Sequence, residues 1–110
     1  MAIKKFFKVF KDRTHGKRVI RELSILRQLN HPCLNRMIDV IVPDDIQRFD
    51  TLYVILEYAE SDLRKYCKSD LQLSDKHVKS IMYNMLLGLK YMHSLKVVHR
   101  DLKPANILLN

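Results

Sequence analysis

Residues 99–106 read His99-Arg100-Asp101-Leu102-Lys103-Pro104-Ala105-Asn106, a polar segment with apolar residues on both sides. Residues 97–99 and 107–109 are expected to form two very short strands around this loop. A single Asp in a loop usually accepts hydrogen bonds from the backbone and has no further role. Here Asp101 lies among Arg100, Lys103 and Asn106, and the order of all eight residues argues for a functional cluster.

The segments before this loop carry helical signals. Apolar residues recur at helical spacing through residues 74–94, and Ser74 is the expected N-cap, so one long helix is predicted there. Met82, Met85 and Met92 lie on its apolar stripe and are expected to be core residues. A shorter helix is predicted over residues 62–68.

The N-terminal half mixes strand and helix patterns. A helix is predicted from Arg18 to Leu29, where apolar residues keep to one face and His31-Pro32 follows as a stop. Strands are predicted at residues 2–10, 37–42 and 52–58, with polar loops at residues 11–17 and 43–50. The sequence therefore predicts an α+β fold.

Composition sets limits on the class of protein. With 110 residues, of which 47% are hydrophobic and 29% charged, the chain is expected to form one globular domain or part of one. The net charge is +8, and residues 1–21 hold eight basic side chains against Asp12 alone, a net of +7. A basic nucleic-acid binder is one interpretation, with Phe6, Phe7 and Phe10 as stacking groups. A solvated strand end and helix start is the favoured one.

The cysteines and the apolar runs indicate an intracellular protein. Cys33 and Cys67 form no C-x-x-C motif, so reduced thiols are expected. The longest apolar run, residues 52–56, is far shorter than the roughly 18 residues that span a bilayer, so no membrane partner is expected. Nothing in the sequence indicates an oligomeric state.

The octapeptide resembles the catalytic loop H-R-D-L-x-x-x-N of eukaryotic protein kinases. The resemblance implies that Asp101 accepts the proton of a substrate hydroxyl and that Asn106 holds Mg²⁺. Lys103, typical of Ser/Thr kinases at this position, would contact the transferred phosphate. ATP and Mg²⁺ are the implied cofactors, and proteins are the implied substrates.

A second resemblance lies at the N-terminus. Ala2-Ile3-Lys4 is similar to the end of the kinase motif V-A-I-K, with Met1 where Val is usual. Lys4 would bind the α- and β-phosphates, and Glu22 on the predicted helix would pair with it. Without the family, Lys4 is an ordinary solvated strand residue and Glu22 balances the charge of its basic neighbours.

Residues 52–59 resemble the strand that leads into the kinase hinge. Leu56 would then be the gatekeeper, and the backbone of Glu57 and of Ala59 would bond adenine. The resemblance also implies that Asp62 contacts ribose and that Ala2 and Leu108 sandwich the adenine ring. The implied division is a partial N-lobe with antiparallel strands and helix αC (residues 1–56), a hinge (57–61) and the start of the C-lobe with its first helices up to the catalytic loop (62–110).

Three segments narrow the resemblance to mitogen-activated protein kinases: residues 2–5, 60–63 and 87–94. Residues 42–50 look most similar to divergent members found in protists. The resemblance implies an upstream activating kinase, a cytoplasmic location with the nucleus as a second one, and a role for Arg100 in binding a phosphorylated activation loop.

Several kinase motifs do not occur within residues 1–110. No G-x-G-x-x-G precedes Lys4, and no D-F-G follows Asn106. This incomplete kinase domain is therefore expected to transfer no phosphate by itself, and helix 74–94 is expected to lack part of its packing partners. A non-catalytic, kinase-like interaction module stays open as an alternative function.

Overall fold

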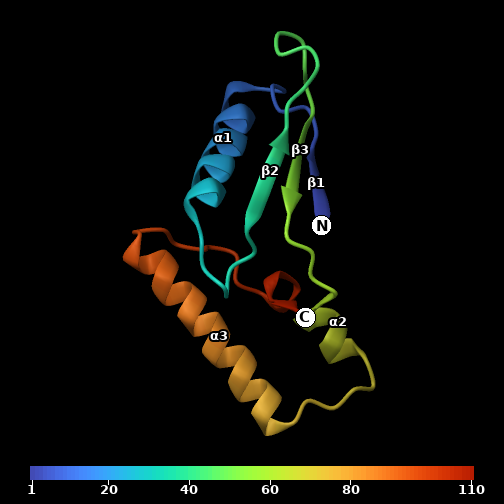
Figure 1. The fold of residues 1–110 in the computed structure, drawn as a ribbon, viewed down its shortest axis with the longest axis vertical. Coiled ribbons are helices and arrows are strands. Elements are labelled where there is room, and N and C mark those ends of the chain that lie inside the picture. The colour runs from blue at the N-terminus through green and yellow to red at the C-terminus, as the bar shows by residue number, and fades with distance from the viewer. The chain divides into compact units, whose positions relative to one another are not determined.

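The computed structural model describes residues 1–110, which divide into two compact units. The first comprises residues Met1–Asn30 and Asn35–Tyr58, and the second comprises His31–Leu34 and Ala59–Asn110. The first unit holds a sheet and one helix, and the second is mainly helical (Figure 1). The α+β class expected from the sequence is confirmed.

The sheet of the first unit has three antiparallel strands: β1 (Ala2–Phe6), β2 (Met37–Ile41) and β3 (Leu52–Leu56), in the order β1-β3-β2. On the central strand, Val54 is opposite both Lys4 and Val40 and is fully buried, with 0% exposure. Removing this apolar side chain from water stabilises the sheet.

Strand β1 ends at Phe6, earlier than predicted. The chain turns at Lys8, whose φ of 48° lies in the left-handed region, and the Val9 N–H donates to the Asp50 carbonyl at 2.8 Å. Val9 is buried at 2% exposure. The prediction of a strand through Phe10 is therefore wrong, because Val9 packs inward from a turn and not from a strand.

Helix α1 runs from Arg13 to Gln28, so it begins five residues before the predicted Arg18. The Asp12 carboxylate accepts the His15 N–H at 2.7 Å and caps the helix. Gly16 lies within the polar stretch 11–17 that is predicted to be a loop, but it belongs to the helix, and a Cβ at this position would lie 3.2 Å from the Val9 carbonyl oxygen. The glycine lets the helix approach the preceding turn, and the predicted loop at residues 13–17 is wrong.

The second unit contains α2 (Leu63–Lys68), α3 (Asp75–Ser94), the 3-10 turn η1 (Pro104–Asn106) and two short strands. Strands β4 (Ser61–Asp62) and β5 (Leu108–Leu109) pair antiparallel. The predicted long helix is confirmed as α3. Part of the predicted strand 107–109 is confirmed as β5.

Residues 97–99 form no strand, contrary to the prediction. The chain leaves α3 through Lys96, which has a φ of 60°, and the Val97 N–H donates to the Met92 carbonyl at 3.0 Å. A second bond, from Lys96 N–H to the His93 carbonyl at 3.0 Å, completes a Schellman motif. Val97 therefore belongs to the end of the helix.

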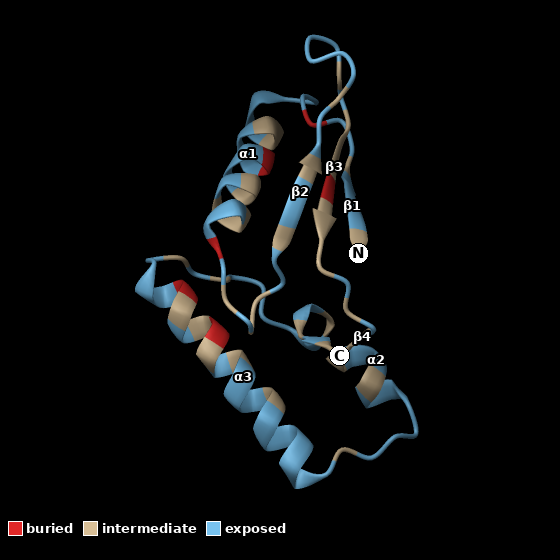
Figure 2. Cartoon of the chain, viewed as in Figure 1, coloured by how far each residue is buried: buried red, intermediate tan, exposed pale blue.

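Packing on α3 is uneven along its length (Figure 2). Gly88 and Met92 are its buried residues, and a Cβ at Gly88 would lie 2.9 Å from the Cys33 carbonyl oxygen. Nearby, His31 stacks on Tyr91 with ring centroids 5.0 Å apart. Segment 31–34 therefore packs on the C-terminal half of this helix.

Several apolar side chains between residues 78 and 86 of α3 are exposed to solvent. Val78, Met82 and Leu86 are exposed by 45%, 46% and 56%. Of the three methionines predicted to be core residues, Met92 is buried, Met85 is partly buried and Met82 is exposed, so the expectation for Met82 is wrong. None of the helices is both long and apolar enough to span a membrane.

Candidate active site

The loop at residues 99–106 is held by short local hydrogen bonds. The Asp101 N–H donates to Nδ1 of His99 at 3.2 Å, and the Asn106 N–H donates to the Lys103 carbonyl at 2.8 Å in η1. Arg100 has a φ of 64°, a left-handed conformation that costs free energy for a residue with a Cβ. This strained residue turns the chain immediately before Asp101.

Three side chains predicted to act together lie in contact. Lys103 Nζ is 2.8 Å from Oδ2 of Asp101, and Asn106 Nδ2 donates to the same oxygen at 2.9 Å. Asn106 Nδ2 also donates to the Asp101 carbonyl at 2.8 Å. We call Asp101, Lys103 and Asn106 the loop cluster. It is exposed to solvent, so a large substrate can reach it.

The hydrogen bonds of the loop cluster favour the ionised form of its carboxylate. The hydrogen bond from Lys103, and next the one from Asn106, lower the pKa of Asp101 below its ordinary value of 3.8. Both donors stabilise the charged form. Asp101 is therefore a carboxylate at neutral pH, the state that can accept a hydroxyl proton.

The loop cluster can supply one protein ligand to Mg²⁺, the amide oxygen of Asn106. The amide nitrogen of Asn106 bonds Asp101, which leaves its amide oxygen free of hydrogen bonds. Mg²⁺ prefers oxygen ligands and usually binds one or two protein groups together with substrate phosphates and waters. No group of three or more His, Cys, Asp or Glu residues could hold a metal ion by itself. Asn106 thus fits as a contributing ligand.

In the first unit, Lys4 on β1 and Glu22 on α1 form an ion pair, with Nζ 2.6 Å from Oε1. Their side chains are 46% and 43% exposed. Ion pairs this open to water stabilise a fold only slightly. The contact orients the Lys4 ammonium group, which also lies 4.7 Å from the centre of the Phe6 ring.

The predicted adenine contacts lie at the end of β3 and after it. Leu56 is opposite Ala2 in the sheet. The Glu57 N–H donates to the Arg36 carbonyl at 3.0 Å, and the Glu57 carboxylate pairs with Arg36 at 3.0 Å. Of the backbone groups of Glu57, the carbonyl is therefore the one left for a ligand. Ala59 belongs to the second unit.

Asp62 and Leu108 are brought together as opposite residues of β4 and β5. The Asp62 carboxylate accepts the Lys65 N–H at 2.9 Å and so caps α2, and its side chain is only 14% exposed. One carboxylate oxygen lies 3.9 Å from Lys65 Nζ and has no closer partner. A ribose contact would have to use that oxygen.

Sequence reasoning missed two of these interactions. Arg36 was not singled out, and no sequence signal links it to Glu57, which is 21 positions away. The capping role of Asp62 had a signal, because an Asp directly before a predicted helix is a preferred N-cap. The first unit holds Lys4 and Glu22, and the second holds the loop cluster.

Comparison with known proteins gives consistent matches. The family described as "Protein kinase domain" matches residues 1–110. The "Mitogen-activated protein kinase homolog NTF6" of Nicotiana tabacum is 39% identical over 110 residues, and "Mitogen-activated protein kinase 7" and "Mitogen-activated protein kinase 14" of Arabidopsis thaliana are 41% and 42% identical. Each match covers 100% of this chain and 30% of the relative. The chain thus spans a little under a third of the length of these relatives.

Proposed function

Because the chain belongs to the protein kinase domain family, we propose that its polar groups serve phosphate transfer from ATP to protein Ser/Thr hydroxyls. The single observation that carries the proposal is the loop cluster, in which an ionised carboxylate, an ammonium group and an amide meet at one oxygen. Residues 1–110 supply part of this activity, and no phosphate transfer is expected from them alone.

Asp101 is the proposed proton acceptor. It is ionised at neutral pH, as an Asp carboxyl ordinarily is, and Lys103 and Asn106 lower its pKa further, so the carboxylate can receive the proton of the attacking hydroxyl. Lys103 would place positive charge beside the transferred phosphate, where negative charge develops. Asn106 orients Asp101 through its amide nitrogen and presents its amide oxygen to Mg²⁺. A bound Mg²⁺ neutralises phosphate charge.

The first unit is proposed to hold the nucleotide. Lys4, oriented by Glu22, would bind the α- and β-phosphates. Adenine is expected to bond the carbonyl of Glu57 and the backbone of Ala59, beside the gatekeeper Leu56. The remaining proposed nucleotide contacts are Asp62 for ribose and Ala2 and Leu108 for the faces of adenine.

A mitogen-activated type of signalling role is supported by the matched relatives, three of which are named as such kinases at 39–42% identity. The proposal includes protein substrates and an upstream activating kinase, with Arg100 contacting a phosphorylated activation loop. An intracellular location, in the cytoplasm and also the nucleus, belongs to the same proposal. Imaging of a tagged protein tests it.

The activity is tested with the full protein that contains residues 1–110. Transfer of labelled phosphate from ATP to a generic protein substrate should fall by a factor of about 100 or more in the Asp101→Asn variant, since general bases contribute rate factors of about 10²–10⁴. Asp70→Asn is the matched control, because Asp70 is exposed and forms no ion pair. Equal activity in the two variants would refute the assigned role of Asp101.

The alternative is a non-catalytic interaction module, which the exposed apolar face of α3 at Val78, Met82 and Leu86 favours. This interpretation predicts that the full protein transfers no phosphate even when Asp101 is intact. It also predicts that Leu86→Ser, which removes apolar surface that is 56% exposed, weakens binding to a protein partner. Phosphate transfer that depends on Asp101 would exclude it.

A further inference from the structure

Arg36 and Glu57 lie where the chain enters β2 and where it leaves β3. The last pair of the ladder between these two strands is Met37 with Leu56, so Arg36 and Glu57 lie directly beyond it. The ladder is irregular at this end, because its register shifts between Met37 and Asp39. Irregularities of this kind locally disrupt the hydrogen bonds of a ladder. Regular strand pairing therefore gives Glu57 little support.

Two contacts with Arg36 supply that support. The Glu57 N–H donates to the Arg36 carbonyl at 3.0 Å, and Arg36 Nη2 lies 3.0 Å from Oε1 of Glu57. The first contact joins the two backbones, and the second joins the two side chains. A residue that is held at its backbone and at its side chain loses more rotational freedom than a residue held at one of them. Arg36 thus anchors Glu57 at the point where β3 ends.

The orientation of Glu57 matters because of its backbone carbonyl. This carbonyl is the group proposed above to accept a hydrogen bond from adenine, and hydrogen bonds weaken steeply when donor and acceptor are misaligned. Adenine carries an amino group at C6, which is a donor. Hypoxanthine carries an oxygen at C6, which is an acceptor and cannot bond a carbonyl. The placement of the Glu57 carbonyl therefore contributes to the choice between these two bases.

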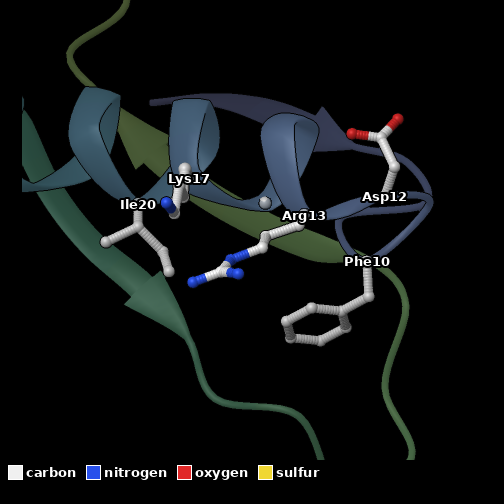
Figure 3. A pocket seen from close by; sticks show the side chains of 6 residues that line it. Phe10, Asp12, Arg13, Lys17 and Ile20 are labelled. Atoms are coloured by element: carbon white, nitrogen blue, oxygen red, sulfur yellow. The ribbon is translucent and has the colours of Figure 1, made fainter.

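Another arginine of the first unit is not engaged in this way. Figure 3 shows the Arg13 side chain extending across a shallow hollow beside α1, between Ile20 and the ring of Phe10. The ion pairs within residues 1–110 include Arg36 but not Arg13. The Arg36–Glu57 pair, with side chains 54% and 44% exposed, contributes little to the free energy of unfolding. Its main effect is on the geometry of Glu57.

We propose that Arg36 is a positioning residue for the nucleotide. Its carbonyl and its guanidinium group hold Glu57 so that the Glu57 carbonyl is aligned with the C6 amino group of a bound adenine. Arg36 acts through Glu57 and needs no contact with the nucleotide. This role rests on the proposed function, which assigns the Glu57 carbonyl to adenine, and it adds a residue that determines the preference of the site for adenine over hypoxanthine.

The test measures the dissociation constants of ADP and inosine diphosphate by isothermal titration calorimetry, with the full protein that contains residues 1–110. Both nucleotides carry the same sugar and phosphates, so the ratio of the two constants reports contacts with the base. Arg36→Gln should lower the preference for ADP about threefold to fivefold, the size expected for loss of an exposed ion pair. Arg36→Lys keeps the charge and should retain most of the preference. The control Arg13→Gln makes the same change on α1 and should leave the ratio unchanged.

Glu57→Gln keeps the test decisive if far-UV circular dichroism shows that Arg36→Gln does not fold. It removes the same ion pair and retains the backbone carbonyl, so it should lower the preference for ADP equally. The double variant Arg36→Gln/Glu57→Gln should lower this preference no further than either single variant, because both changes remove one interaction.

The positioning role and the proposed function fail in different ways. If the unmodified protein prefers ADP and this preference is unchanged in Arg36→Gln and Glu57→Gln, the positioning role of Arg36 is overturned alone. Equal losses in Arg36→Gln and Arg36→Lys, or in Arg36→Gln and Arg13→Gln, would overturn it too. If the unmodified protein shows no preference for ADP, the adenine contact of Glu57 is refuted, and the positioning role with it.

Discussion

The amide nitrogen of Asn106 lies 2.9 Å from Oδ2 of Asp101 and 2.8 Å from the carbonyl oxygen of the same residue. This double contact closes the segment of residues 101–106 on itself. Lys103 approaches the same Oδ2 at 2.8 Å. The proposed proton acceptor is thus positioned by its near neighbours in sequence, which also lower its pKa.

The first prediction concerns the pKa of Asp101. The Lys103→Met variant should raise this pKa toward 3.8, and Asn106→Ala should raise it less, since the bond from Lys103 is the larger cause of the lowering. The pKa is followed by NMR titration of the Asp101 carboxyl carbon. Lys65→Met, which removes a lysine near Asp62, is the control and should leave Asp101 unchanged. An unchanged Asp101 pKa in Lys103→Met would contradict the assigned cause.

The sign of the pH dependence follows from the same shift. An acid whose pKa is lower in the folded state stabilises the fold above its unfolded pKa, and that stabilisation is lost as pH falls through the folded value. Near neutral pH the contribution of Asp101 is therefore constant, and it declines only below pH 3.8. Lys103→Met should remove the contribution of Asp101 to the loss of stability at acidic pH. The free energy of unfolding of the unmodified protein and of Lys103→Met, measured by denaturation across acidic pH, tests this.

A second prediction separates stability from nucleotide binding at the Lys4–Glu22 pair. Glu22→Gln should change the free energy of unfolding by no more than about 1 kcal/mol, because both side chains are nearly half exposed. Phosphate transfer by the full protein should fall up to about a hundredfold, since a misplaced binding group can cost that much. Glu60→Gln, an exposed glutamate in no ion pair, is the control. A large loss of stability with normal activity would assign the pair a purely structural role.

Gly88 carries a prediction about packing. In Gly88→Ala the new Cβ would lie 2.9 Å from the Cys33 carbonyl oxygen and 3.1 Å from Leu34 Cδ2, so α3 or segment 31–34 must shift. Overpacking costs about 1–3 kcal/mol and outweighs the helix propensity of Ala. The protein should melt at a lower temperature.

The comparison for Gly88→Ala is Gly16→Ala, whose Cβ would lie 3.2 Å from the Val9 carbonyl oxygen. That contact is less tight, so its free-energy cost is smaller. The gain in helix propensity from Gly to Ala, about 1 kcal/mol, offsets a larger share of that cost. Thermal unfolding should therefore rank Gly88→Ala as the more destabilising change. The opposite ranking would show that segment 31–34 can move away from α3 at little cost in free energy.

A stabilising change is expected at Lys96. Its φ of 60° is unfavourable for a residue with a Cβ, and Lys96→Gly should raise the free energy of unfolding by about 1 kcal/mol. Lys96→Ala keeps the Cβ and should give no such gain. The control Lys79→Gly, within α3, should lower stability by about 1 kcal/mol. The free energies of unfolding are measured by chemical denaturation. A lower value for Lys96→Gly than for Lys96→Ala would contradict the role of the left-handed backbone.

Local signals in the sequence identified several features correctly. Helix α3 was predicted from its apolar period and from Ser74, whose hydroxyl accepts the His77 N–H at 3.4 Å. Residues 99–106 indicated a cluster around Asp101, and the contacts of Lys103 and Asn106 lie within five residues of it. The spacing of 18 residues between Lys4 and Glu22 also indicated their pairing through the family resemblance.

Interactions between distant segments depended on the tertiary structure. A Gly within a polar stretch usually indicates a loop, yet Gly16 lies within α1, where the Val9 carbonyl approaches it closely. Asp62 meets Leu108 only because β4 and β5 pair across the chain. Residues 97–99 have strand propensity but lack a paired strand, because the end of α3 uses the Val97 N–H. A short stretch of sequence is enough to predict helix caps, the apolar period of a helix and the polar groups of a loop. Strand pairing and close packing depend on distant residues, which are brought together only in the folded chain.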